Sequence, residues 1–197
     1  MERSLTVVFD LGEVLVPSTG VLPRLASELR VSEDELAAAY WPPRKAYDRG
    51  DPAAAYWTAV LEGLGRTPER DLLARLEHLD STKWSTLPPS SGALLDRLTR
   101  DGVRLCVLSN APAPLAAAVR AASWSAQVVH LVFSADAALL KPEPEIYAHA
   151  DAVYGTSPGD VVFFDDRTEN VEAARAHGWD AHVWVDPETA LGVVARG

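Results

Sequence analysis

Short, unbroken apolar runs alternate with helical patterns along most of this chain, and this alternation constrains the fold more than any other feature. Helical patterns precede or separate the last four runs, at residues 90–100, 112–122, 143–154 and 168–177. A strand, a crossover helix and a second strand form a right-handed unit with parallel strands. Apolar runs without polar alternation are typical of strands that are buried on both faces. The sequence therefore predicts a mostly parallel sheet, with strands at 5–9, 103–108, 128–133, 161–164 and 181–185.

The interval between the first apolar run and Pro88 breaks this alternation. About 70 residues there contain no convincing strand, but helical stretches occur near 22–30, 33–41, 52–64 and 68–78. The pair Pro88–Pro89 is a suitable hinge for the return of the chain to the sheet. We therefore expect an α/β fold: a Rossmann-like, doubly wound parallel sheet core (residues 1–16 and 88–197) with a small helical cap inserted after the first strand (residues 17–87).

Charge and cysteine content exclude several classes of function. The chain has 18 Lys and Arg against 28 Asp and Glu, a net charge of −10, so it lacks the basic surface of a nucleic-acid or anionic-membrane binder. Its one cysteine, Cys106, excludes an internal disulfide and a Cys-rich zinc site. No signal-peptide pattern and no membrane-spanning run is present, so we expect a cytoplasmic protein. Residues 17–87 hold 9 basic and 11 acidic residues, which leaves a net −8 in the predicted core.

Polar residues follow three of the predicted strands. Asp10 ends the first strand, Ser109 and Asn110 follow the second, and Asp165 and Asp166 end the fourth. Open α/β sheets bind their ligands at the carboxyl edge. If the first and fourth strands are neighbours, three carboxylates converge there, and their repulsion requires a proton or a cation. Oxygen ligands without a His or Cys cluster favour Mg²⁺.

A fourth segment belongs with these three. Lys141, in ALLKPEPEIY, follows an apolar stretch and precedes a helical pattern, where its charge could neutralise a carboxylate or a bound phosphate. In order and spacing, the four segments resemble the motifs of the haloacid dehalogenase-like hydrolase superfamily over essentially the whole chain. The segments FDLGEVL and FFDDRTENVEAA are most similar to the sugar-phosphatase-like subgroup that includes α-D-glucose-1-phosphatase. They are also similar to the amino-terminal phosphatase domain of soluble epoxide hydrolases.

The resemblance implies a role for each motif residue and an activity for the chain. It implies a Mg²⁺-dependent phosphatase that acts on a small phosphorylated metabolite, with a sugar phosphate favoured, through an aspartyl-phosphate. Whether the enzyme is a monomer or a homodimer is left open. The implied roles are nucleophile for Asp10; phosphate binding for Ser109, Asn110 and Lys141; Mg²⁺ binding for Asp10, Asp166, Asp165 and the Gly12 backbone carbonyl; and support of the site for Asn170.

One position departs from the family pattern. Most phosphatases of the family carry a second Asp two residues after the nucleophile, as general acid and base, and here that position is Gly12. Such assistance supplies about 10²–10⁴-fold in rate. Glu13 is adjacent, but neighbouring side chains on an extended segment point to opposite faces, so we do not assign it the role. A good leaving group, such as an anomeric phosphate, tolerates the loss.

Two other functions remain open at this stage. In a haloacid-type dehalogenase, Asp10 would attack carbon, and the halide would leave without a proton, but the Asp165–Asp166 pair would have no purpose. A non-catalytic binding or regulatory protein would keep the fold and could keep the metal, but the retention of Asp10, Ser109, Lys141 and both late acids argues against a full loss of activity.

The predicted cap supplies the remaining candidates for substrate contact. Its tryptophans should build its interior, with one or two of them lining the substrate pocket. Its one basic cluster should lie on a solvated face, from which it could contact an anionic or hydroxylated substrate. The tryptophans are Trp41, Trp57 and Trp84, and the basic cluster is Arg44, Lys45 and Arg49.

Overall fold

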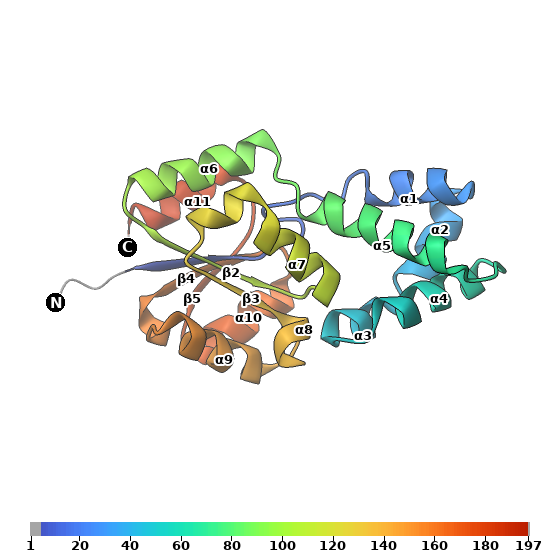
Figure 1. Ribbon diagram of the computed structural model, residues 1–197. Coiled ribbons are helices and arrows are strands. Elements are labelled where there is room, and N and C mark those ends of the chain that lie inside the picture. The colour runs from blue at the N-terminus through green and yellow to red at the C-terminus, as the bar shows by residue number, and fades with distance from the viewer. Residues whose placement is uncertain (1–4, 197) are drawn as a thin grey trace.

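The computed structural model describes residues 5–196, in which helices enclose a parallel sheet and a bundle of helices extends beyond one end of that sheet (Figure 1). The sheet has five strands in the order β3-β2-β1-β4-β5, and every neighbouring pair is parallel. The strands are β1 (Thr6–Phe9), β2 (Arg104–Ser109), β3 (His130–Phe133), β4 (Val161–Asp165) and β5 (Asp180–Val183). The predicted α/β, Rossmann-like fold is therefore confirmed.

Helices cover both faces of the sheet. On one face lie α6 (Pro89–Arg100), α7 (Ala113–Ala121) and α11 (Pro187–Val194), and on the other lie α9 (Pro144–Tyr154) and α10 (Thr168–His177) (Figure 1). Alternate side chains of β1 are buried on opposite faces, because Val7 and Phe9 belong to one apolar cluster and Val8 to the other. Burial on both faces explains why the strands have no polar alternation in the sequence.

Between β1 and α6 the chain forms the helical bundle, which we call the cap. Ser32 and Glu35 start the second of its helices with a capping box, in which each side chain accepts a hydrogen bond from the other residue's backbone N–H. Trp57 is fully buried in the cap interior. The boundaries of the cap at residues 17 and 87 stay a prediction. The helices are α1 (Val21–Leu29), α2 (Glu33–Tyr40), α3 (Arg44–Arg49), α4 (Ala53–Gly63) and α5 (Arg70–Trp84).

The cap differs from the sequence expectation in three respects. The helix α3 was not predicted, because its six residues lie between Pro42–Pro43 and Gly50 and are too few to show a helical period. The expectation that Arg44 lies on a solvated face is wrong, since α3 turns this side chain into the cap, where it is buried. The helix α5 also continues to Trp84, past the predicted end at residue 78.

Short elements complete the connections between β2 and β4. They are η1 (Ser123–Gln127), α8 (Ser134–Ala137) and η2 (Pro158–Asp160). Within residues 5–196, none of the helices has the length and apolar character needed to cross a membrane.

Candidate active site

The strand order reverses at β1, which lies between β2 and β4. In open α/β sheets such a switch point opens the crevice in which ligands bind. The residues that end or follow these three strands, Asp10, Ser109 and Asp165, therefore meet at one edge. The backbone N–H of Asp10 donates to the carbonyl of Phe164 at 2.9 Å, which joins the start of the loop after β1 to the end of β4.

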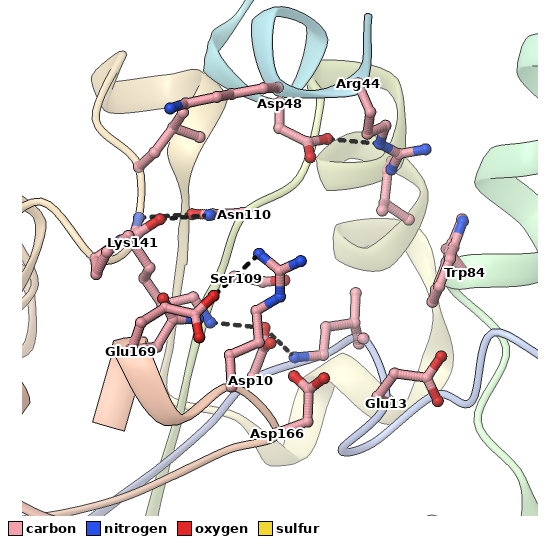
Figure 2. A pocket seen from close by; sticks show the side chains of 18 of the residues that line it. Asp10, Glu13, Arg44, Asp48, Trp84, Ser109, Asn110, Lys141, Asp166 and Glu169 are labelled. Carbon is pink, nitrogen blue, oxygen red and sulfur yellow. Dashed lines mark hydrogen bonds and ion pairs between the residues drawn. The ribbon is translucent and has the colours of Figure 1, made fainter. Parts of the chain in front are cut away.

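Lys141 is the centre of a buried charge network at this edge. Its Nζ lies 2.9 Å from Asp10 Oδ1 (Figure 2). The same atom lies 2.6 Å from Asp165 Oδ2 and donates to the Leu108 carbonyl at 2.9 Å. Burial disfavours the charged ammonium, but the charges of Asp10 and Asp165 outweigh burial and raise the pKa of Lys141. Lys141 therefore remains a cation in this setting.

Asp165, the last residue of β4, and Asp166, which follows it, have different surroundings. Asp165 is fully buried, and besides Lys141 it accepts hydrogen bonds through Oδ1 from Asn170 Nδ2 and from the Arg167 backbone N–H, both at 2.9 Å. Asp166 is partly exposed and lines the pocket, and burial together with the charge of Asp165 raises its pKa. Protein donors thus occupy both oxygens of Asp165, whereas Asp166 faces the pocket.

Three carboxylates come together at the sheet edge. Oxygens of Asp10, Asp165 and Asp166 lie within 4.8 Å of one another. Burial raises the pKa of Asp10 to about 7, with the charge of Asp165 adding to the rise and Lys141 opposing it. When all three are ionised, the Lys141 ammonium between them leaves two negative charges in excess. Such an excess, on oxygen donors, fits a divalent cation.

Other polar atoms of the site are consistent with a hydrated cation. Within residues 5–196, Asn170 Oδ1 is a buried oxygen that accepts no hydrogen bond, and Asn170 lines the pocket. Cations such as Mg²⁺ retain several waters, which need acceptors nearby. The residues present therefore fit the metal that the sequence predicts.

Ser109 and Asn110 contribute to the edge in different ways. Ser109 is buried, and its hydroxyl opposes the rise in the pKa of the Asp10 carboxyl. The Asn110 amide contacts the backbone of Lys141: Nδ2 donates to the Lys141 carbonyl at 2.9 Å, and Oδ1 accepts from the Lys141 N–H at 2.8 Å (Figure 2). Asn110 thus fixes the loop that carries Lys141, a contact that sequence analysis did not predict.

The loop after Asp10 brings no second acid toward the nucleophile position. A Cβ added to Gly12 would lie 3.5 Å from Cζ3 of the Trp84 ring. Glu13 has a left-handed backbone (φ 57°), and its Oε1 accepts from the Ser18 backbone N–H at 3.0 Å. The Glu13 carboxylate is thus held within its own loop.

A pocket of about 650 Å³ lies between this edge and the cap. Trp41 and Trp84 line it from the cap side, and Trp41 is 46 % exposed, which is unusual for a large apolar side chain. Asp48 and Lys45 of α3 also line it. Two of the three cap tryptophans therefore face the pocket, as the sequence analysis allowed.

A polar network in the cap wall was not predicted. Arg44 Nε donates to Asp48 Oδ1 at 2.8 Å, and Arg44 Nη1 lies 3.3 Å from Asp80 Oδ2 and also donates to the Tyr40 hydroxyl. The Tyr40 hydroxyl in turn donates to Asp80 Oδ1 at 2.7 Å. Burial raises the pKa of Asp48 to about 6, although Arg44 lowers it. The spacing of Arg44 and Asp48, four residues apart, is the one sequence signal of this network.

The helix α3 is also tied directly to the core. Ser134 Oγ accepts from the Ala111 backbone N–H at 2.9 Å and donates to the carbonyl of Asp48. Arg49 pairs with Glu143 and donates to the Ala138 carbonyl. Asp48 is therefore held at a fixed place beside the loop that follows β2.

Comparison with known proteins agrees with this geometry. Residues 5–178 match the family described as haloacid dehalogenase-like hydrolase. Among curated proteins, the chain is similar to the sesquiterpene phosphatase astK of Aspergillus oryzae (strain ATCC 42149 / RIB 40), with 34 % identity over 87 residues. That match spans 44 % of this chain and 44 % of the relative, so less than half of the relative's length is matched.

Solved structures share the fold over nearly the full length. A HAD family enzyme of Bacteroides thetaiotaomicron superposes with a TM-score of 0.75 at 17 % identity, covering 96 % of this chain and 98 % of that one. The same enzyme is known in complex with magnesium and inorganic phosphate (TM-score 0.69, 18 % identity, 92 % and 94 % covered). An L-2-haloacid dehalogenase of Xanthobacter autotrophicus, with chloropropionic acid covalently bound, superposes with a TM-score of 0.72 at 19 % identity, covering 98 % and 82 %.

Proposed function

The chain belongs to the haloacid dehalogenase-like hydrolases and is therefore an enzyme, and from this premise we propose that it is a Mg²⁺-dependent phosphatase. Its substrate is a small phosphorylated metabolite, with a sugar phosphate favoured. The observation that carries the proposal is the excess negative charge of Asp10, Asp165 and Asp166 around Lys141. A divalent cation would balance this charge and, with Lys141 beside it, would let the anionic phosphate of a substrate approach Asp10.

In this proposal each residue of the edge has a defined task. Asp10, Asp166 and the Gly12 carbonyl hold the metal, and Asp165 acts through its contacts to Lys141 and Asn170. Bound Mg²⁺ supplies positive charge that reduces the repulsion between the carboxylate of Asp10 and the phosphate. The contacts of Asp165 to Lys141 and Asn170 orient the groups that touch metal and substrate.

Asp10 acts as the nucleophile. An Oδ atom of its carboxylate forms a bond to phosphorus while the bond from phosphorus to the leaving oxygen breaks, which gives an aspartyl-phosphate that water then hydrolyses. Lys141 and the Ser109 hydroxyl donate hydrogen bonds to phosphoryl oxygens. Asn110 keeps its predicted role and also donates to the phosphate. Donors that are already fixed, as Lys141 is by Asp165 and Leu108, stabilise the charge of the transition state without reorganising.

One relative supports a phosphatase, because the partial match is to a protein named as a phosphatase. The structural neighbours are 17–19 % identical to this chain and show the fold alone, both the enzyme known with magnesium and inorganic phosphate and the L-2-haloacid dehalogenase. Displacement of a halide from carbon needs no cation, and a dehalogenase would leave the acidic cluster without a function.

The test is phosphate release by the purified protein from a panel of sugar phosphates and an aryl phosphate, in Mg²⁺ and in EDTA. We expect turnover in Mg²⁺ only. The isosteric variant Asp10→Asn, which keeps the shape of the site but removes the nucleophile, should lose at least about 10³-fold in kcat/KM.

Two outcomes would contradict the proposal. Release of halide from 2-haloacids, unaffected by EDTA, would identify a dehalogenase. A folded protein that binds neither Mg²⁺ nor phosphate in calorimetry, and that turns over no ester, would identify a non-catalytic member of the family.

A further inference from the structure

We infer that this enzyme selects phosphate compounds whose leaving group departs without a proton: phosphates of phenols, of enols, of carboxylic acids or of anomeric hydroxyls. The inference rests on the proposed phosphatase function and names its substrate class. It follows from what surrounds Gly12, the position at which a proton donor would stand beside Asp10.

An aromatic ring, and no acid, borders that position. A Cβ at Gly12 would meet Trp84 Cζ3 at 3.5 Å. Trp84 is 7 % exposed, and its Nε1 donates to the Tyr40 hydroxyl at 3.4 Å, while Tyr40 is itself held by Asp80 and Arg44. The indole is thus fixed from behind and presents carbon, which cannot donate a proton, to the loop that carries Gly12.

The other acids that line the pocket are engaged elsewhere. Asp10 and Asp166 have roles as nucleophile and metal ligand in the proposed function. Glu13 accepts from the backbone of Ser18 within its own loop, and in Figure 2 it lies on the side of Trp84, away from Lys141. Asp48 is paired with the buried Arg44 guanidinium at 2.8 Å.

The last acid of the pocket, Glu169, belongs to the exposed rim. Its carboxylate lies 3.6 Å from the Arg167 guanidinium, and both side chains are more than half exposed. Among residues 5–196, no acid lining the pocket is therefore both beside Asp10 and free of another task.

The chemistry of the first step sets the substrate class. As the bond from Asp10 to phosphorus forms, the electron pair of the breaking P–O bond passes to the leaving oxygen. Without a donor, that oxygen leaves as an anion and takes its proton from water afterwards. The barrier then rises with the basicity of the leaving oxygen. An alkyl phosphate, which releases an alkoxide, therefore lacks the rate increase of roughly 10²–10⁴-fold that a general acid supplies.

The experiment measures kcat/KM in saturating Mg²⁺ for aryl phosphates whose phenols differ in acidity, with a simple alkyl phosphate at the end of the series. For the native chain we expect a steep decline with leaving-group pKa, of about 10²–10⁴-fold across the series. Gly12→Asp, which supplies a carboxyl group, should make this decline less steep, and it should raise kcat/KM most for the alkyl phosphate. Gly12→Ala controls for the added side chain, since its methyl group meets Trp84 at an ordinary contact distance. Whatever its overall rate, its kcat/KM should decline with leaving-group pKa as steeply as that of the native chain.

The outcomes separate this inference from the function on which it rests. Similar rates for aryl and alkyl phosphates in the native chain would overturn the selectivity but leave a phosphatase. If kcat/KM of the native chain declines only slightly with leaving-group pKa, but declines steeply in Asp48→Asn, then Asp48 of the cap supplies the proton. The inference is again wrong in that case. Absence of turnover with every ester overturns the proposed function itself.

Discussion

The Lys141 ammonium is almost fully buried, and two carboxylates and a backbone carbonyl surround it. A charge in such a place is tolerated because its partners are in contact with it. Removal of one partner leaves the others buried and unpaired, which costs more than the pair contributes. The stability of this edge and the proposed catalysis therefore depend on the same side chain.

Replacement of this lysine should destabilise the metal-free protein. We expect Lys141→Met to lower the free energy of unfolding by about 3–5 kcal/mol, because Asp10 and Asp165 lose their cation. Urea unfolding in EDTA at pH 7 measures the change. In the double variant with Asp165→Asn the loss should be smaller than the sum of the single losses, since the two groups interact. Additive losses would show that the 2.6 Å contact contributes nothing.

Asp10 should make stability depend on pH when no metal is bound. Its pKa is about 7 in the folded protein, against 3.8 as the ordinary value, so the folded state binds the extra proton between these values. Stability from this group is complete below about pH 4 and is lost as pH rises to about 7. In EDTA, the melting temperature of the native chain should therefore fall relative to that of Asp10→Asn over this pH range, and the difference should be constant above it.

Mg²⁺ supplies the control for this pH dependence. By occupying the site it should raise the melting temperature of the native chain at pH 8 more than that of Asp10→Asn. A constant difference between the two proteins from pH 4 to pH 8 in EDTA would contradict the shifted pKa.

The sequence predicted which residues meet at this edge, because strand ends and crossovers place Asp10, Ser109 and Asp165 together once the sheet is parallel. It did not predict the contacts among them. That Asn110 holds the backbone of Lys141, or that Asp165 faces inward and Asp166 toward the pocket, depends on loop conformation and side-chain direction. Neither follows from spacing.

At the scale of elements, α3 supplies part of the pocket wall although it has only six residues. It places Arg44 inside the cap and Asp48 on the pocket wall, and it contacts the core through two ties of different kinds. Ser134, which is fully buried, donates to the Asp48 backbone, whereas Arg49, whose side chain is 40 % exposed, pairs with Glu143.

The two ties should differ in strength. Ser134→Ala removes a fully buried hydroxyl and leaves the Ala111 N–H without its acceptor, so we expect a loss of about 1–3 kcal/mol in the free energy of unfolding. Arg49→Ala breaks an ion pair that water already screens, and its loss should be the smaller of the two. Denaturant titrations measure the free energy of unfolding of both variants. A larger loss in Arg49→Ala than in Ser134→Ala would contradict the prediction that the Ser134 contact is the stronger one.

Segments with a clear helical pattern were predicted well, and three short helices were not. The helices at 168–177 and 89–100 were found within a residue or two, because each shows more than two turns of pattern. The helices α3, α8 and α11 were missed. Each has eight residues or fewer, and their limits are set by prolines, caps and tertiary contacts more than by periodicity.

At the scale of the whole molecule, one apolar cluster joins the cap to the sheet. It contains Trp57 and Leu61 of the cap interior together with Phe9, Val107 and Phe164 of the sheet. The second cluster lies on the other face, under α9 and α10, and shares the same strands. A cluster that continues from one part to the other couples their unfolding, since neither part can expose its apolar face alone without cost.

Cap and core should therefore unfold together. We expect pulsed hydrogen exchange in increasing urea to label peptides from α4 and from β1 at the same midpoint, which also coincides with loss of far-UV circular dichroism. Earlier labelling of α4 would mean that the cap opens as a unit of its own, and the continuous cluster would then be too weak to couple it to the sheet. Coincident midpoints would mean that the pocket, which cap and core build jointly, persists until the whole molecule unfolds.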